Sequence, residues 1–243
     1  MIRVESLAKR FGAVQAVRGV SFAAADGCVT GLLGPNGAGK TTTLRMISTL
    51  VAPDAGRIEI DGIDTAREPL AARERLGLLS DARGLYARLT ARENIAYYGE
   101  LRGLGRDRID AAIDAIAPQL ELGALLDRRT DGFSQGERMK VAIARALVHD
   151  PRNVVLDEPT NGLDVRSTRS LREAIRLLRE TGKCVLFSSH VMQEVAALCD
   201  EIVIVAGGCV VAAGTPGAIR ERAACEDLEE AFVRLAGEPG DER

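Results

Sequence analysis

A glycine-rich segment near the amino end of the chain has the residue types and spacing needed to bind phosphate. Residues 34–41 read Gly-Pro-Asn-Gly-Ala-Gly-Lys-Thr and match the pattern G-x-x-x-x-G-K-[ST] at every fixed position. Glycine lets backbone N–H groups surround an anion, and a helix beginning at Lys40 would add the positive end of its dipole. The segment therefore predicts a triphosphate site in which Lys40 reaches the β- and γ-phosphates and the Thr41 hydroxyl ligates Mg²⁺.

An ordinary glycine turn could match this pattern by accident, at a rate of about once in a hundred chains of this length. The segment, however, lies between an expected strand at 29–33 and an expected helix from about 40 to 50. This context favours the nucleotide-binding interpretation. The residues of the segment expected to contact ATP are Gly34, Pro35, Asn36, Gly37, Ala38, Gly39, Lys40, Thr41 and Thr42.

Two adjacent carboxylates end an apolar stretch later in the chain. Asp157 and Glu158 follow residues 153–156, which read Asn-Val-Val-Leu and predict a strand. In P-loop ATPases an acid at the carboxyl end of a neighbouring parallel strand holds Mg²⁺, which is the role we expect for Asp157. Glu158 is suited to orient and deprotonate the attacking water. Two acids after a strand are also compatible with a solvated turn, but their combination with the phosphate loop favours a catalytic pair.

The elements that must position these residues can be read from periodicity. The first 33 residues are rich in strand patterns, residues 57–60 predict a further strand, and about 82–150 are mainly helical. Strand patterns then return, separated by an amphipathic helix around Leu171, Ile175 and Leu178. The later strands are expected at 153–156, 184–188 and 202–205. Strands alternating with helices predict an α/β fold with a largely parallel sheet, into which the helical block is inserted.

Composition narrows the class of protein. The 243 residues suffice for one large α/β domain, and a net charge of -3 argues against a surface built to bind nucleic acid. The most apolar late stretch, 202–214, is shorter than the about 20 residues that a membrane-spanning helix needs, so the chain is not expected to enter a membrane by itself. The five cysteines are scattered and predict free thiols rather than a metal site or disulfides.

A further motif makes a family resemblance specific. Residues 133–137, Phe-Ser-Gln-Gly-Glu, precede the acidic strand and resemble the LSGGQ signature of ATP-binding-cassette (ABC) proteins, with Ser134 and Gly136 kept. The resemblance covers residues 1 to about 218. Its remaining matches follow the family's order: Phe11, the Asp157-Glu158-Pro159-Thr160 strand end, the Gly162-Leu163-Asp164 D-loop and His190 after a strand.

The resemblance implies a fold and a mechanism. The fold is a P-loop NTPase with a RecA-like core, an antiparallel β subdomain at the N-terminus and the α-helical insertion; residues 219–243 would add a short helix and a frayed tail. Phe11 would stack on adenine, and His190 would act with Glu158 and Lys40 in catalysis. Ser134 and the Gly136 N–H would contact the γ-phosphate held by a second copy, which completes the electrostatic stabilisation of the reaction.

Each motif also has a plainer interpretation. Ser134 with Glu137 forms an ordinary helix capping box, and Asp164 is a common turn or N-cap residue. Phe11 could belong to the core, and a lone histidine such as His190 is more often buried and satisfied than catalytic. The joint order and spacing of the motifs favours the ABC interpretation.

The chain departs from the family pattern at two places. Asp81 stands where the family has the glutamine of its Q-loop, and we expect it to remain a contact to Mg²⁺ or to water. Gln135 replaces the first glycine of the signature. Its side chain must point away from the phosphate, or the closed pair of subunits would be looser than usual.

The leading functional hypothesis is an ATP-binding and ATP-hydrolysing subunit of an ABC transporter. Two copies, or one copy and a similar subunit, would close on ATP and drive integral membrane permease subunits from the cytoplasmic face of the membrane. The residues around 89–94 and 214–216 resemble those of ABC-2-type subunits, which serve the export of sodium or drugs. The alternatives are a soluble ABC-type ATPase of translation or DNA repair and a small-molecule kinase with the same phosphate loop.

Overall fold

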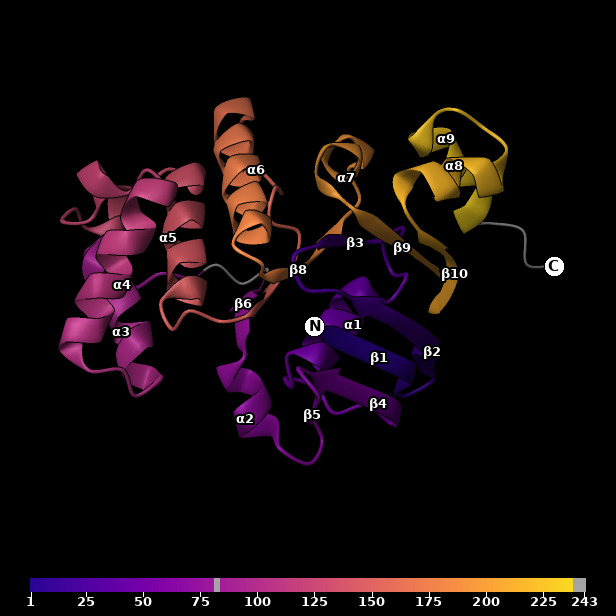
Figure 1. The fold of residues 1–243 in the computed structure, drawn as a ribbon, viewed down its shortest axis with the longest axis horizontal. Helices are drawn as coiled ribbons and strands as arrows, with labels where there is room; N and C mark the ends of the chain where they lie inside the picture. Colours follow the sequence, from indigo (N-terminus) through magenta and orange to yellow (C-terminus); the bar gives the residue numbers. More distant parts are fainter. Residues whose placement is uncertain (81–83, 238–243) are drawn as a thin grey trace.

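The computed structural model describes residues 1–80 and 84–237, which form two sheets with helices around them (Figure 1). The first sheet has the strand order β2-β1-β4-β5 and is antiparallel throughout. Along β1, apolar Ile2 and Val4 are buried and the intervening Arg3 is exposed, as expected for a sheet with one wet face. The strands are β1 (Ile2–Phe11), β2 (Val14–Ala24), β4 (Ala55–Ile60) and β5 (Ile63–Asp64).

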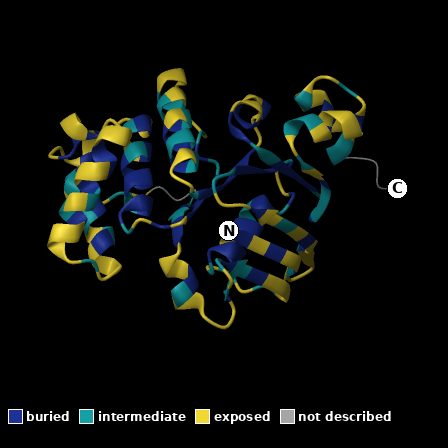
Figure 2. Cartoon of the chain, viewed as in Figure 1, coloured by how far each residue is buried: buried dark blue, intermediate teal, exposed yellow. Residues whose placement is uncertain are grey.

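The second sheet is central and has the order β10-β9-β3-β8-β7-β6. The strands β9, β3, β8, β7 and β6 run parallel to one another. The edge strand β10 pairs antiparallel with β9. Strands β3, β7 and β8 are buried along their whole length because both faces of the sheet are covered (Figure 2). The strands are β3 (Val29–Leu33), β6 (Leu76–Leu79), β7 (Asn153–Leu156), β8 (Cys184–Ser189), β9 (Glu201–Ala206) and β10 (Cys209–Gly214).

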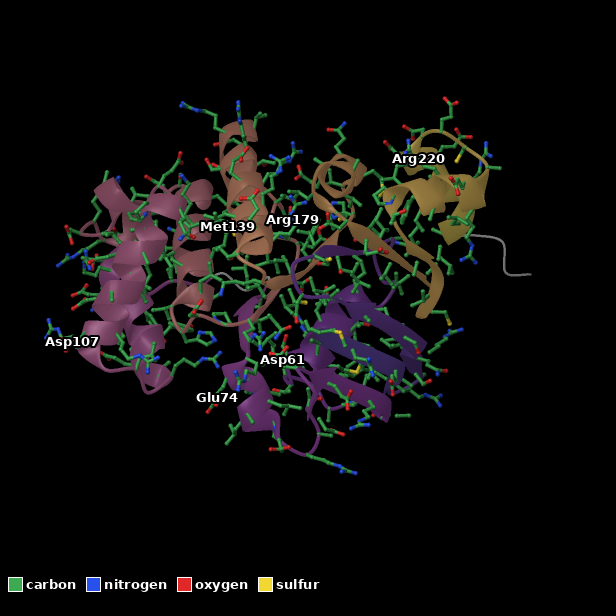
Figure 3. The ribbon with its side chains drawn as sticks, viewed as in Figure 1. Asp61, Glu74, Asp107, Met139, Arg179 and Arg220 are labelled. Atoms are coloured by element: carbon green, nitrogen blue, oxygen red, sulfur yellow. The ribbon has the colours of Figure 1, made fainter. Side chains whose placement is uncertain are left out.

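Two hydrophobic cores lie on the two faces of this sheet. On one face, α1 packs between the central sheet and the antiparallel sheet, with Leu44, Met46 and Ile47 buried. On the other face, α6 covers the strands with Leu171, Ile175 and Leu178, which confirms the predicted amphipathic helix. Side chains of the helices and of the central sheet lie between the layers on both faces of the sheet (Figure 3).

The helices α3, α4 and α5 form a separate layer at one end of the molecule, and α8 and α9 lie at the other end (Figure 1). The α-helices are α1 (Lys40–Ile47), α2 (Pro69–Glu74), α3 (Ala91–Leu101), α4 (Arg106–Gln119), α5 (Gln135–Leu147), α6 (Val165–Glu180), α7 (Met192–Leu198), α8 (Pro216–Ala223) and α9 (Leu228–Ala236). Two short 3₁₀ turns, η1 (Gly123–Leu125) and η2 (Thr130–Gly132), connect α4 to α5. Within residues 1–80 and 84–237, no helix is long and apolar enough to cross a membrane.

Several element ends differ from expectation. Helix α1 ends at Ile47 rather than near residue 50, because the Ser48 hydroxyl bonds to the Leu44 carbonyl and Thr49 takes a positive φ of 58°. Residue 218, where the cassette was expected to end, lies inside α8, which Thr215 caps, and the short helix α9 follows it. Of the expected frayed tail, Gly237 is described and 238–243 lie outside the described residues.

Candidate functional site

The glycine loop connects β3 to α1 in the middle of the central sheet. Two of its glycines are required by close contacts: a Cβ atom on Gly34 would lie 2.2 Å from the Val205 carbonyl oxygen, and one on Gly39 would lie 2.5 Å from the Ala16 oxygen. Gly39 also has a φ of +102°, which only glycine adopts readily. The loop backbone is thereby held against β9 and β2 while α1 begins at Lys40.

Lys40 bends back over the loop. Its Nζ donates to the Gly34 carbonyl at 2.6 Å and to the Pro35 carbonyl at 3.2 Å, and lies 4.0 Å from Glu158 Oε1. Burial lowers the pKa of the Lys40 ammonium, and the nearby Glu158 and Asp157 carboxylates oppose this shift. The cation is therefore placed among carbonyls and carboxylates, at a point where phosphate oxygens could replace these partners.

The acidic pair sits at the carboxyl end of β7, next to α1. Asp157 is buried, with 4% of its surface exposed, and its Oδ1 accepts a hydrogen bond of 2.7 Å from the Ser188 hydroxyl. The same hydroxyl accepts from the Glu158 N–H at 2.9 Å. The Thr41 hydroxyl lies 3.5 Å from Asp157 Oδ1. One serine of β8 thus holds both acidic residues in place.

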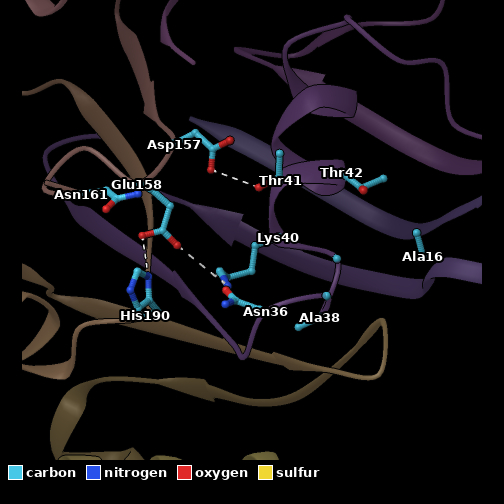
Figure 4. A pocket seen from close by; sticks show the side chains of 12 residues that line it. Ala16, Asn36, Ala38, Lys40, Thr41, Thr42, Asp157, Glu158, Asn161 and His190 are labelled. Atoms are coloured by element: carbon cyan, nitrogen blue, oxygen red, sulfur yellow. Dashed lines mark hydrogen bonds and ion pairs between the residues drawn. The ribbon is translucent and has the colours of Figure 1, made fainter. Parts of the chain in front are cut away.

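Glu158 connects the two sides of the site. Its Oε2 lies 2.9 Å from His190 Nδ1, and its Oε1 faces Lys40 (Figure 4). The residue has a positive φ of 45°, a region that non-glycine residues seldom occupy and that is concentrated at functional sites. His190 remains half exposed at the end of β8. This arrangement places a carboxylate between an ammonium and an imidazole at the edge of the sheet.

These groups surround one cavity of about 570 Å³, a size typical of small-molecule sites. It is lined by residues of the glycine loop, of the acidic strand end and of the neighbouring strands (Figure 4): Ala16, Asn36, Gly37, Ala38, Gly39, Lys40, Thr41, Thr42, Asp157, Glu158, Asn161 and His190. Most residues predicted from the sequence are brought together here. Gly34 and Pro35 are not among these lining residues, and their carbonyls accept hydrogen bonds from Lys40 instead.

The donor set at this cavity fits Mg²⁺ shared with phosphate. A carboxylate (Asp157) and a hydroxyl (Thr41) lie side by side on its wall, and Mg²⁺ in nucleotide sites takes one or two protein oxygens together with phosphate and water. Among residues 1–80 and 84–237, there is no group of three or more His, Cys, Asp or Glu that could hold a metal alone. Asp81, the further ligand expected from the sequence, lies outside the described residues.

Three other predicted contacts, Phe11, Ser134 and Gly136, lie outside the set that lines this cavity in the described part of the chain. Phe11 ends β1 with 50% of its surface exposed, and the Lys9 ammonium lies 5.5 Å from its ring centroid. Ser134 caps α5 through a complete capping box with Glu137. A Cβ on Gly136 would lie 2.1 Å from Ser167 Oγ, so the start of α5 packs tightly on the start of α6.

The Gln135 side chain turns toward the D-loop. Its Nε2 lies 3.4 Å from the Asn161 carbonyl oxygen and would be 2.5 Å from a Cβ on Gly162. The Gln135 side chain, which is larger than the glycine of the signature, therefore packs against residues of its own chain. The expectation that this side chain points away from the phosphate remains a prediction, and the contact with the D-loop is compatible with it.

Three residues of the site were missed by sequence reasoning. Ala16 and Asn161 line the cavity, and Ser188 orders the acidic pair. Nothing in the local sequence marks an alanine as a pocket residue. Ser188 could have been found only with the strand order, because β8 pairs with β7 so that Phe187 lies opposite Leu156 and the following residues share one edge.

A glycine loop between a central parallel strand and a helix, facing two acids at the end of a parallel strand two positions away in the same sheet, defines a P-loop nucleotide-binding domain. Comparison with known proteins makes this class more specific. The family model described as "ABC transporter" matches residues 17–161. The ABC transporter ATP-binding protein NatA of Bacillus subtilis is 44% identical over 96% of this chain and 97% of its own length. The daunorubicin resistance ATP-binding protein DrrA3 of Streptomyces coeruleorubidus is 37% identical over 98% of this chain and 75% of its own.

Solved structures agree. The structure of an ATP-binding subunit of an ABC transporter has a TM-score of 0.89, is 29% identical, and covers 98% of this chain and 100% of its own. A dimeric cassette in a post-hydrolysis state bound to ADP and Pi has a TM-score of 0.78, is 25% identical, and covers 88% and 98% of the two chains.

The chain belongs to the ABC transporter family and is one of its ATP-binding cassette ATPases. This confirms the predicted fold class and the resemblance to export subunits of the NatA type. A soluble ATPase of translation or DNA repair, the alternative left open by the sequence, is not favoured.

Proposed function

We propose that the chain hydrolyses Mg²⁺–ATP as one of two cassettes that close on the nucleotide and drive export through separate membrane permease subunits. One observation carries this proposal: Lys40, Asp157, Glu158 and His190 meet at one cavity, whereas the signature residue Ser134 lies elsewhere on the same chain. Because the signature residues lie outside the cavity of their own chain, a second copy is needed to supply them.

Within the cavity, the backbone N–H groups of the glycine loop and the Lys40 ammonium hold the phosphates. Thr41 and Asp157 are the residues that would hold Mg²⁺, which when bound neutralises charge on the transferring phosphoryl group. Glu158 lies beside them and acts as the base that orients and deprotonates the attacking water. His190, 2.9 Å from Glu158 Oε2, holds this carboxylate and the water in position.

The second copy contributes its signature. Ser134 and the Gly136 N–H lie at the start of α5, where free N–H groups and the helix dipole favour an anion. In the closed pair they would contact the γ-phosphate held by the partner and complete the electrostatic stabilisation of the transition state. The dimeric state of the related cassette bound to ADP and Pi supports this arrangement.

Two further contacts belong to the proposal. Phe11 stands at the tip of the β1–β2 hairpin, which also contributes Ala16 to the cavity wall, and its exposed ring is available to stack on adenine. Asp81 would contact Mg²⁺ or its water from the segment that follows β6. The permease would dock on the side of the cassette that carries the α3–α5 layer, which places the cassette on the cytoplasmic face of the membrane.

The direction of transport is proposed from the relatives. Their names include linearmycin resistance, daunorubicin resistance and Nod factor export ATP-binding proteins. Export is therefore the direction we propose for this chain. Its cavity serves the nucleotide rather than the exported compound. The exported compound would be recognised by the permease subunits.

Substitution of Glu158 by glutamine tests the mechanism. Glu158→Gln keeps the shape of the side chain but removes the base, so ATP hydrolysis should fall by about 100-fold or more while binding persists. The variant should then accumulate as an ATP-bound dimer, seen as a shift in size-exclusion chromatography with Mg²⁺–ATP.

The matched controls are wild-type protein with ADP and the double variant Glu158→Gln/Lys40→Ala. Both should elute as monomers, because neither retains a triphosphate between two copies. A Glu158→Gln protein that binds ATP at saturation but stays monomeric would contradict the two-copy mechanism.

A further inference from the structure

Helices α6 and α7 are joined by an ion pair whose residues are not among those that line the candidate site. Arg172 Nε donates to Glu194 Oε2 at 2.8 Å and Arg172 Nη2 to Glu194 Oε1 at 2.7 Å, which is a two-pronged arrangement. The Glu194 side chain is only 7% exposed and that of Arg172 28%. Planar, doubly bonded guanidinium–carboxylate pairs are the most direction-specific of ion pairs. This pair therefore fixes both the separation and the relative orientation of the two helices.

Helix α7 depends on such contacts. It has 7 residues, too few for stability on its own, and no side chain caps its start at Val191. Its position is set by the burial of its apolar side chains and by the Arg172 ion pair. Arg176 of α6 adds one hydrogen bond of 3.3 Å to the Ala197 carbonyl, and Arg179 donates to Asp200, which lies beyond α7. Arg179, next to the C-terminal residue of α6, lies on the side of this helix toward α7 (Figure 3). Of these three arginines, Arg172 is the one that pairs with a buried carboxylate of α7 itself.

The pair connects the two segments that carry Glu158 and His190. One residue, Val191, separates His190 from the start of α7. The Val191 N–H donates to Ser189 Oγ at 3.0 Å. Helix α6 begins at the D-loop, where Asp164 caps it and the Asn161 N–H donates to the Glu158 carbonyl at 3.2 Å. The Glu158–His190 contact of 2.9 Å closes this ring of connections.

We propose that Arg172 and Glu194 are positioning residues for His190: the pair holds α7 on α6 so that the imidazole stays within reach of Glu158. The proposal rests on the proposed catalytic role of His190. Because removal of the Arg172 guanidinium leaves the Glu194 carboxylate buried without its counter-charge, α7 must shift or expose that carboxylate to water. Either response moves the backbone next to His190.

The test compares turnover with nucleotide affinity. In Arg172→Met, kcat for ATP should fall about tenfold, because small misplacements of a catalytic group cost rate, while KM should change less than about twofold because the phosphate loop is untouched. Measurements are made at a temperature where circular dichroism shows every variant to be folded. Arg172→Lys keeps the charge but loses the two-pronged geometry and should lie between Arg172→Met and wild type.

The decisive readout is a double-mutant cycle with His190. If Arg172 acts through His190, adding Arg172→Met to His190→Ala should cause no further loss of kcat. Arg176→Met is the matched control: it removes an arginine one turn further along α6, 40% exposed, which contacts an exposed Glu173 and one backbone carbonyl. Its kcat should stay close to wild type.

Should Arg172→Met fail to fold, the pair Arg172→Met/Glu194→Gln removes both buried charges together and leaves neither without a partner. A folded variant with reduced thermal stability but wild-type kcat would show a purely structural pair and overturn the proposal. So would an equal loss of kcat in the His190→Ala background. Wild-type kcat in His190→Ala itself would instead overturn the proposed role of His190, and this inference with it.

Discussion

Ser188 is not among the residues that line the cavity, yet its hydroxyl holds both acidic residues of the site, Asp157 and Glu158. It donates to the buried Asp157 carboxylate at 2.7 Å and accepts from the Glu158 N–H at 2.9 Å. Ser188→Ala should therefore lower the free energy of unfolding by about 2–3 kcal/mol, because it leaves a buried charged acceptor and a backbone donor short of a partner. Urea unfolding without nucleotide measures this loss free of any contribution from bound ligand.

The neighbouring Ser189 is the matched control. It is equally buried, but its hydroxyl accepts only the Val191 N–H at 3.0 Å, so Ser189→Ala should cost about 1 kcal/mol. Equal losses in the two variants would contradict the special role of Ser188.

At the scale of single residues, Lys40, Asp157 and Glu158 were predicted from motifs of fixed spacing and His190 from the order of motifs in the resembling family. The structure brings all four to one cavity, and their roles stay predictions. Sequence reasoning failed at Ser188, whose importance depends on the pairing of β8 with β7, which no short stretch of sequence reveals. The orientation of Gln135 toward Gly162 likewise follows from packing between α5 and the D-loop.

At the scale of elements, Asn94 fixes the turn that enters the helical layer. It is fully buried, its Oδ1 accepts from the Tyr86 N–H at 2.9 Å, and its Nδ2 donates to the carbonyls of Tyr86 (3.1 Å), Leu89 (3.3 Å) and Thr90 (2.9 Å). Asn94→Ala removes these four hydrogen bonds. The Tyr86 N–H loses its acceptor, whereas the three carbonyls keep the Thr130 hydroxyl, the Thr130 N–H and the Asn94 N–H as donors, so the change should cost about 2 kcal/mol. The loss should appear as faster amide exchange in α3 with unchanged protection in β3 and β8, measured by mass spectrometry.

Thr90→Ala provides the comparison for this prediction. It removes the side-chain cap of α3 at the same turn and should cost only about 1 kcal/mol. Exchange in α3 that responds no more to Asn94→Ala than to Thr90→Ala would refute the role given to Asn94.

The elements predicted well are those whose own residues decide their structure. The strand at 153–156 is continuous apolar sequence between breakers and has the predicted bounds. The short helices α2 and α7, with 6 and 7 residues, were not predicted because helices of this length are stabilised by their neighbours rather than by their own residues. The C-terminal region gave two helices for the same reason: α9 packs on α7, β9 and β10, which its sequence cannot indicate.

At the scale of the whole molecule, stability should depend on pH through His149. Burial, and next the Arg102 guanidinium, lower the pKa of this imidazole to about 4. The neutral ring contacts the Leu76 carbonyl through Nε2 at 3.1 Å, and in the described part of the chain its buried Nδ1 has no hydrogen-bond partner. Because the unfolded chain binds this proton near pH 6.5, stability is fully present above that pH and is lost as pH falls toward 4.

Between pH 6.5 and 5 the loss should be about 1 kcal/mol, after allowance for the partly exposed ring. His149→Gln should abolish this part of the pH dependence, as measured by urea unfolding across the same window. Wild-type protein, measured across the same pH window, is the control and should show the full slope. An unaltered slope in His149→Gln would assign it to other groups.

The separation of Ser134 from the cavity of its own chain has a genetic consequence. Under the proposed mechanism a subunit that has lost Lys40 still lends a sound Ser134 to its neighbour, and a subunit that has lost Ser134 still offers a sound Lys40. Two null alleles of this kind, each inactive alone, would therefore complement one another when expressed together, because one intact site forms in every mixed pair.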